Sequence, residues 1–310
     1  MSEGTVVGTK PWLPPPLARS RWWTEPVPAE RLAALRIGVG LVMLIDLLAT
    51  YRFTDFYGHL GLTDHDAVDR WFSVNRLFEI GSSDRTPTTF FLFLAPMAWL
   101  VTSLGLVVGF CSRVCALGAW LIAIRVHNYN WPLHNGGDMI KIIILFYLML
   151  SPCGAVWSLD AVRRDRYASV PRPVLIPPWP LRLLFIQLAL IYCCNGLMKL
   201  MGPDWKDGSA MHWIMGNLTL VRWSPNQLPL PDWLLRATTW AVVAWEISFP
   251  VLVWNPRLRP WVLALGLLFH LSNLVLIEVG MFPLYMLCLY LPFLPGERLR
   301  KGGVVVSGER

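Results

Sequence analysis

The stretch NGLMKLMGPDW, residues 195–205, places a lysine at the end of a long apolar run. Tyr192, Asn195 and Lys199 recur at intervals of three and four residues, so they share one face of a helix. A polar stripe on an apolar helix faces protein or water. Lys199 therefore has two interpretations. Its amine either reaches up to the membrane interface or lies in a dry site, where desolvation favours the neutral base.

Other polar residues also interrupt apolar segments. His270 and Asn273 share a helix face, and His270 could be an imidazole bonded to a neighbouring helix or part of a site. Glu246 could pair with a lysine or arginine on another helix as an interhelical tie. Each ionisable group at membrane depth is a candidate functional residue, because burying it there is costly unless it is paired or hydrated. The full set is Asp46, Lys141, Lys199, Glu246, His270 and Glu278.

The segment WPLHNGGDM places His134, Asn135 and Asp138 between two apolar runs. These residues predict either a glycine turn, with Asn or Asp capping the next helix, or part of a site. A metal site built from His127, His134, Asp138 and His270 fits no standard zinc spacing, so we predict no metal. The sequence also has no GxSxG, P-loop or strand–helix GxGxxG motif. Ordinary hydrolases, nucleotidases and dehydrogenases are therefore excluded.

Membrane helices must position these residues. Of 310 residues, 55% are hydrophobic and 15% are charged, and the mean hydropathy is +0.48; soluble domains carry about 25% charged residues. The formal charge is +7, but most arginines lie in short loops beside apolar segments. This placement favours membrane lipid, and not nucleic acid, as the partner. We predict an all-α polytopic membrane helix bundle, with no particular oligomeric state.

The predicted bundle has about eight transmembrane helices. The candidate spans are 32–51, 88–110, 113–131, 138–157, 180–201, 233–254, 260–279 and 281–295. Residues 52–85 resemble an amphipathic helix in the outer interface, and 209–223 are a second candidate. Arginines in alternate connecting segments place both termini in the cytoplasm. The predicted organisation is an N-terminal tail at 1–30, a transmembrane domain at 31–295 and a C-terminal tail at 296–310.

This topology places most of the ionisable residues in the outer half of the membrane. Asp46 and Lys199 come late in outward helices, and Lys141 comes early in an inward one. His270 and Glu278 share one outward helix, and Glu278 ends it. Because a random scatter would not share a side, we predict one outward-opening polar cavity inside the bundle.

Two longer motifs resemble a known family. IYCCNGLMKLMGPDWKDGSAM is similar to the vitamin K-dependent gamma-carboxylase pattern of a tyrosine, small residues, glycine and lysine, then Asp-Trp and Gly-x-x-Met. FHLSNLVLIEVGMFPLYML is similar to its Phe-His-x-x-Asn segment followed by Gly-Met-Phe. VWSLDAV resembles its Trp-Ser-x-Asp, and LHNGGD lies where that family has an Asn/His pair. The broader set is the HTTM domain family of bacterial membrane proteins, and the resemblance covers about residues 30–295.

The resemblance implies a carboxylase, a lyase, in the bacterial plasma membrane with an extracytoplasmic active face. Lys199 would deprotonate a reduced vitamin K or menaquinol-type quinol, and O2 would add to give an epoxide. The strong base so generated would take a proton from a peptide glutamate, to which CO2 adds. His134 or Asn135 would orient the quinone, with His270 near the same cavity. The residues predicted to bind substrate or quinone are Tyr192, Asn195, Trp205, Glu246, Asn273, Met281 and Phe282.

The sequence departs from the carboxylase pattern in two places. Met198 replaces the first of two adjacent lysines, and one extra residue separates Lys199 from Asp204. The large extramembrane region that grips the substrate in the animal enzyme also has no counterpart up to residue 310. An alternative function is therefore a non-catalytic membrane partner for the maturation or export of a secreted peptide. A transporter or lipid-binding scaffold predicts internal pseudo-symmetry, which the sequence does not show.

Overall fold

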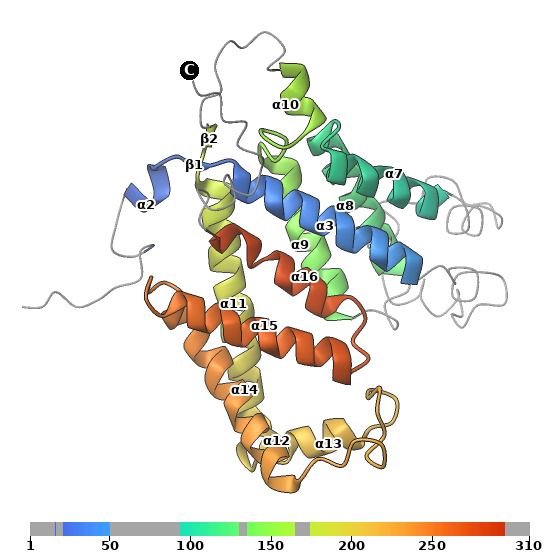
Figure 1. Ribbon diagram of the computed structural model, residues 1–310, viewed down its shortest axis with the longest axis vertical. Helices are drawn as coiled ribbons and strands as arrows, with labels where there is room; N and C mark the ends of the chain where they lie inside the picture. Colours follow the sequence, from blue (N-terminus) through green and yellow to red (C-terminus); the bar gives the residue numbers. More distant parts are fainter. Residues whose placement is uncertain (1–15, 17–20, 50–93, 130–134, 165–173, 295–310) are drawn as a thin grey trace, which may run out of the picture.

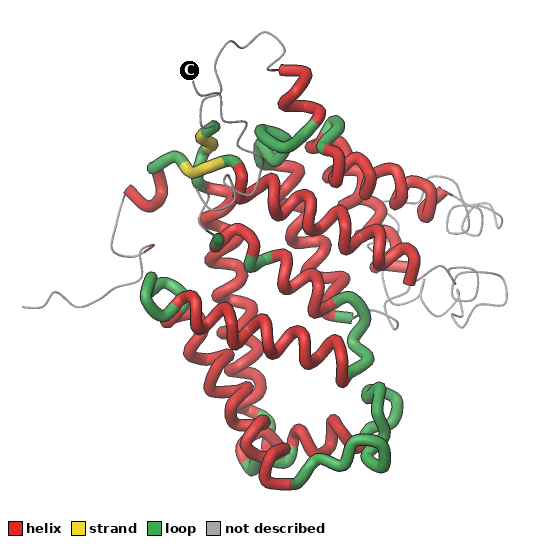
Figure 2. Tube along the Cα trace, viewed as in Figure 1, coloured by secondary structure: helices red, strands yellow, loops and turns green. Residues whose placement is uncertain are grey.

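The computed structural model describes residue 16 and residues 21–49, 94–129, 135–164 and 174–294. Helices dominate this part of the chain (Figure 2), so the predicted all-α class is confirmed. The described residues contain one small sheet, in which β1 (Val27–Pro28) pairs antiparallel with β2 (Leu175–Ile176). This pair ties the residues before the first long helix to the residues before α11. The short helix α2 (Arg21–Thr24) precedes β1.

Each of the eight predicted apolar segments contains a helix. These helices are α3 (Glu30–Ala49), α7 (Ala95–Val108), α8 (Ser112–Tyr129), α9 (Gly136–Leu150), α11 (Trp179–Met201), α14 (Asp232–Leu252), α15 (Arg259–Leu276) and α16 (Phe282–Cys288), the last followed by the 3-10 turn η5 (Leu291–Phe293). The shorter helices are α10 (Leu159–Arg164), α12 (Pro203–Lys206) and α13 (Ala210–Gly216). Helix α13 occupies part of the second predicted amphipathic segment. The first, 52–85, lies outside the described residues, as does the predicted tail at 296–310.

Within the described residues, three helices are long and apolar enough to cross a membrane: α3, α11 and α15. Helix α7 and the segment Phe282–Phe293 are apolar but shorter. The sequence predicted about eight crossings. Two features explain part of the difference: α9 has 15 residues, and α14 carries Asp232, Arg236 and Glu246.

The long helices form two groups that meet at α16 (Figure 1). Helices α3, α7, α8 and α9 pack in succession in the first group, and α11 packs along α14 in the second. Helix α16 lies against α3 and α9 on one side and against α15 on the other. A continuous hydrophobic core joins both groups. Side chains on α16 can therefore contact the polar residues of either group.

The VWSLDAV motif lies at one end of the first helix group. The guanidinium of buried Arg36 on α3 donates hydrogen bonds of 2.6 Å to the carbonyls of Leu106 and Trp157. Asp160 accepts hydrogen bonds from the backbone N–H and the hydroxyl of Ser112, at 2.8 and 2.7 Å. Burial alone would raise the pKa of Asp160, but these hydrogen bonds and the charge of Arg36 hold it below its usual range. This motif therefore has a structural role in joining α3, α7, α8 and α10.

Candidate functional site

Lys199, in the last turn of α11, is paired with Glu246 on α14. Its Nζ atom lies 2.6 Å from each carboxylate oxygen of Glu246. Glu246 is buried, whereas 22% of the Lys199 side chain is exposed. The ring of Trp205, on α12, lies 5.2 Å from the amine. The predicted pairing of Glu246 with a cation on another helix is therefore confirmed, and the side chain of that cation is partly exposed.

A glycine allows α11 and α14 to come close enough for this pair. A Cβ atom at Gly196 would lie 2.8 Å from Cγ1 of Ile247 and 3.1 Å from its backbone nitrogen. It would also lie 3.2 Å from Cβ of Glu246. Contacts this short require the neighbours to shift, so a larger residue would push the helices apart where Lys199 and Glu246 meet.

A second set of polar side chains is buried where α11 meets α15 and the turn after α16. The hydroxyl of Tyr192 lies 2.7 Å from Nε2 of His270 and 2.6 Å from the hydroxyl of Tyr290. The sequence interpretation of His270 as an imidazole bonded to a neighbouring helix is thus confirmed. Its other ring nitrogen, Nδ1, is buried and has no hydrogen-bond partner among the residues that the structure describes. Nδ1 of His270 is therefore available for a hydrogen bond with a further polar group.

Aromatic rings surround these three side chains. The Tyr192 ring lies 4.7 Å from the Trp245 ring and 4.2 Å from the Phe249 ring. Sequence reasoning missed Tyr290. Its signal was a tyrosine in the apolar run LCLYLPFL, because a buried phenol needs a hydrogen-bond partner. These three side chains therefore form a buried cluster with few polar atoms, packed among aromatic rings.

The two sets lie at different levels of one helix interface. Tyr192 precedes Lys199 by two helical turns, about 10 Å along α11, and Trp245 directly precedes Glu246 on α14. We call Tyr192, Lys199, Glu246, His270 and Tyr290 together the Lys199 site. It offers an accessible amine at its end and a partly satisfied imidazole further inside.

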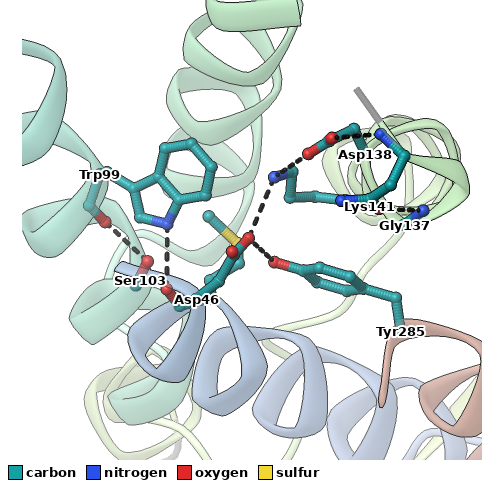
Figure 3. Close-up of polar contacts among 9 residues, drawn as sticks. Asp46, Trp99, Ser103, Gly137, Asp138, Lys141 and Tyr285 are labelled. Carbon is teal, nitrogen blue, oxygen red and sulfur yellow. Dashed lines mark hydrogen bonds and ion pairs between the residues drawn. The ribbon is translucent and has the colours of Figure 1, made fainter. Parts of the chain in front are cut away.

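A separate polar cluster lies in the first helix group (Figure 3). Nζ of Lys141 on α9 lies 2.9 Å from Asp138 and 3.2 Å from Asp46 on α3. The hydroxyl of Tyr285 on α16 donates a 2.9 Å hydrogen bond to Asp46. The Trp99 ring lies 4.2 Å from the Lys141 amine. We call these five residues the Lys141 cluster; its lysine side chain is only 3% exposed.

The ionisable residues therefore do not share the single cavity predicted from the sequence. Asp46 and Lys141 belong to one group, and Lys199, Glu246 and His270 belong to another. Glu278 is exposed and lies 2.8 Å from Arg222. The physical reason is local pairing, since each charge has an opposite charge or a polar group on an adjacent helix or connection.

The HNGGD segment caps α9. The side chain of Asn135 accepts a hydrogen bond from Gly137, and Asp138 accepts one from the Asn135 backbone. The capping interpretation is thus confirmed, while His134 lies outside the described residues. Gly280 of the Gly-Met-Phe segment has a φ of 57°, and a Cβ there would lie 2.7 Å from Nδ2 of Asn135. The two motifs therefore meet at this capping asparagine.

The remaining predicted binding residues are dispersed. Asn195 is exposed on α11, and Asn273 is half-buried on α15. Met281 and Phe282 pack against the hydrophobic core. The Phe282 ring lies 5.7 Å from the His270 ring and also contacts the start of α9. Phe282 is thus the side chain that joins the Lys199 site to the asparagine-capped end of α9.

Cysteines and metal ligands add no further site here. All six cysteines are free thiols; Cys153 and Cys288 are buried, whereas Cys111 and Cys194 are exposed. Across the described ranges, no group of three or more His, Cys, Asp or Glu side chains is placed to hold a metal ion.

Comparison with known proteins identifies the family. The sequence model of the HTTM domain matches residues 24–297. The chain belongs to the HTTM domain family. It is also 23% identical over 175 residues to the sporulation-delaying protein SdpB of Bacillus subtilis (strain 168). That alignment covers 53% of this chain and 52% of SdpB, so the chain spans about half the length of this relative.

No solved structure matches the chain significantly. The HTTM match includes both polar groups described above, from Asp46 on α3 to Tyr290 after α16. With its apolar helices, this HTTM protein is a membrane protein.

Proposed function

We propose that this HTTM protein is a multi-pass membrane enzyme in which Lys199 takes a proton from a lipid-soluble quinol. The proposed overall reaction is carboxylation of a peptide glutamate coupled to quinol epoxidation, with O2 and CO2 as co-substrates. One observation carries the proposal. The Lys199 amine is held 2.6 Å from both oxygens of a buried carboxylate, and the Lys199 side chain is partly exposed.

A buried pair of this kind can supply a neutral amine. Removing two charges from water is costly, and transfer of the ammonium proton to the carboxylate abolishes both charges at once. Glu246 would then keep that proton while the lone pair of Lys199 accepts another from the substrate. A desolvated site also protects a strong base from water. Glu246 acts in this account by holding the proton that Lys199 gives up.

The residues around the amine fit an aromatic ligand with hydroxyl groups. Trp205 offers a ring beside Lys199, and the neighbouring Met198 and Met201 are 70% and 78% exposed. Apolar surface with a few directed polar groups is typical of such ligand sites. When bound, the quinol would supply the electrons that reduce oxygen. The chain's own residues would bind it, orient it and accept its proton.

We also propose that the shorter helices complete about eight membrane crossings, with both termini in the cytoplasm. The active face would then be extracytoplasmic in the bacterial plasma membrane. Supporting this arrangement, arginines are concentrated in alternate connecting segments, including Arg163 and Arg164 in α10 and Arg257 before α15.

The test compares two lysines on the same stretch of chain. Purified protein in detergent would be given vitamin K hydroquinone, and epoxide formation would be followed for wild type, Lys199→Ala and Lys206→Ala. Lys206 is exposed, so its variant controls for the loss of one positive charge. We expect Lys199→Ala to lose at least about 100-fold in rate, the lower range for a general base. Equal rates for all three proteins, or no epoxide from wild type, would reject the proposal.

A second candidate is a non-catalytic membrane partner in the maturation or export of a secreted peptide. The observation that favours it is the same ion pair, because a buried ion pair between α11 and α14 can also act as a structural tie between these helices.

The double exchange Lys199→Glu with Glu246→Lys separates the two candidates. It keeps an ion pair between the helices but moves the amine from α11 to the buried position on α14. A tie would survive the exchange, so peptide maturation would be close to wild type. A base would not, so epoxide formation would remain as low as in Lys199→Ala.

A further inference from the structure

The three candidate membrane spans each begin with an arginine in the first turn. Arg31 is the second residue of α3, Arg182 the fourth of α11 and Arg259 the first of α15. The N-terminus of a helix carries a partial positive charge, which favours anions and disfavours cations there. Three arginines at three helix N-termini are therefore an electrostatically unfavourable arrangement unless negative charge is supplied.

An aromatic platform brings two of these arginines together. The guanidinium of Arg182 lies 4.6 Å over the Trp22 ring, and Trp22 packs edge-on against Trp254 at 5.8 Å. Arg259 donates a 2.9 Å hydrogen bond to the carbonyl of Val253 and one of 3.5 Å to that of Trp254. The Trp22 ring thus positions the guanidinium of Arg182, and backbone carbonyls just before α15 position that of Arg259.

Within the described residues, two acidic side chains lie beside the three arginines, so positive charge is in excess there. The β1–β2 pair joins the residues before α3 to those before α11, which places Arg31 and Arg182 at the same end of the bundle. The acidic groups that act on them are Glu25, beside Arg182, and Glu30, beside Arg31. Nε of Arg31 and Nε of Arg182 are buried with no hydrogen-bond partner among the described residues. The described part of this cluster thus carries more positive than negative charge.

The surface beside this cluster is that of a membrane interface. Trp23, Trp179 and Trp261 lie at or just before these helix starts and are 39%, 38% and 73% exposed. Exposed tryptophans are typical of the headgroup level of a bilayer. Exposed Leu183 and Leu258 add apolar surface beside the arginines. A ligand here would meet donors for an anion and an apolar wall for hydrocarbon.

We propose that Arg31, Arg182 and Arg259 form a binding site for the phosphate of an anionic phospholipid. Guanidinium groups bind phosphate through paired N–H donors, and basic pockets between membrane helices on the cytoplasmic side take anionic headgroups. The acyl chains would lie along the apolar surface near Trp261. The site is about 25 Å from Lys199 along α11. It therefore does not rest on the proposed enzyme activity.

The test is lipid binding by the full chain in a neutral detergent. Native mass spectrometry would count bound phosphatidylglycerol and phosphatidylcholine for wild type and for the triple variant R31Q/R182Q/R259Q. A matched control, R163Q/R222Q/R236Q, removes three exposed arginines elsewhere. We expect wild type and control to retain one phosphatidylglycerol in preference to phosphatidylcholine. The triple variant should bind it roughly 100-fold more weakly, given the contribution of each arginine near a lipid surface.

A lysine triple variant and a competition with inorganic phosphate complete the test. The variant R31K/R182K/R259K retains the charge but not the paired donors, so it should fold and bind with intermediate affinity. Inorganic phosphate should compete only weakly, because it lacks acyl chains. Equal binding of the two lipids by wild type, or unchanged phosphatidylglycerol binding in both triple variants, would overturn the proposal. Full displacement by phosphate at low millimolar concentration would overturn the assignment to lipid.

Discussion

Two lysines lie within the helix bundle, and their surroundings differ in how completely each charge is satisfied. Lys141 is 3% exposed and is held by two carboxylates and an aromatic ring. Lys199 is 22% exposed, and the structure gives its amine Glu246 as a carboxylate partner and the Trp205 ring nearby. Both pairs connect neighbouring helices, so pairing alone does not distinguish a structural lysine from a chemical one.

The difference suggests which lysine can change its charge. In the Lys141 cluster, two carboxylates face one ammonium, so transfer of the lysine proton to one of them would still leave the other carboxylate charged. In the Lys199 site, one carboxylate faces one ammonium, and a single proton transfer neutralises both. The two sites therefore differ in whether one proton transfer can remove every charge of these ion pairs.

The largest expected effect is on stability, and it comes from the Lys141 cluster. Lys141→Met leaves Asp46 and Asp138 without their shared cation. We expect a loss of about 3–5 kcal/mol in the free energy of unfolding, the range for breaking a buried ion pair. The measurement is the thermal unfolding midpoint in detergent by circular dichroism. Lys199→Met should cost clearly less, because Glu246 can take up a proton. Equal losses for the two variants would remove the distinction between the two lysines.

A smaller effect is expected where α11 and α14 touch. Gly196→Ala places a methyl group 2.8 Å from Ile247, so we expect a loss of about 1–3 kcal/mol from overpacking. The same change at Gly216, where nothing lies within 4 Å, provides the control and should cost little. Unfolding midpoints of the two variants give the comparison. If Gly196→Ala is as stable as Gly216→Ala, the close approach of the helices is not needed for the Lys199–Glu246 pair.

Two tyrosine variants compare the two groups, and the smallest effect is expected for Tyr290. Tyr285→Phe removes a hydrogen bond to the carboxylate of Asp46, and we expect a loss of about 1.5–3 kcal/mol. Tyr290→Phe removes a neutral hydrogen bond to Tyr192, which keeps its contact with His270, so about 1 kcal/mol is expected. Chemical or thermal unfolding of both variants measures the difference. A larger loss for Tyr290→Phe would mean that the Lys199 site contributes more to the fold than the Lys141 cluster.

Much of the fold could be predicted from the sequence because membrane helices are marked by hydropathy. All eight apolar segments contain helices, and the capping role of Asn135 followed from an asparagine before two glycines. The number of long spans could not be read in the same way. Charged residues such as Arg236 and Glu246 lie inside α14, and hydropathy does not say whether neighbouring helices neutralise them.

The candidate site could be predicted only in part. Glu246 was expected to have a cationic partner, and Lys199 was singled out, but their pairing depends on which helices are neighbours. The prediction of a single polar cavity was wrong, because residues at the same predicted depth in the membrane need not lie side by side within the bundle. Tyr285 and Tyr290 were missed since each lies in an apolar run, where a tyrosine is indistinguishable from a packing residue until its hydroxyl partner is known.

Chemical rescue of Lys199→Ala tests the central claim most directly. Because the Lys199 side chain is partly exposed, a small primary amine added to the variant should reach the space that the truncated side chain leaves. We predict that ethylamine restores epoxide formation from vitamin K hydroquinone in Lys199→Ala, in proportion to the concentration of the neutral amine, and leaves wild type unchanged. Epoxide formation that is lost in the variant and not restored by any small amine, or that never depended on Lys199, would contradict the assignment of this amine as the base.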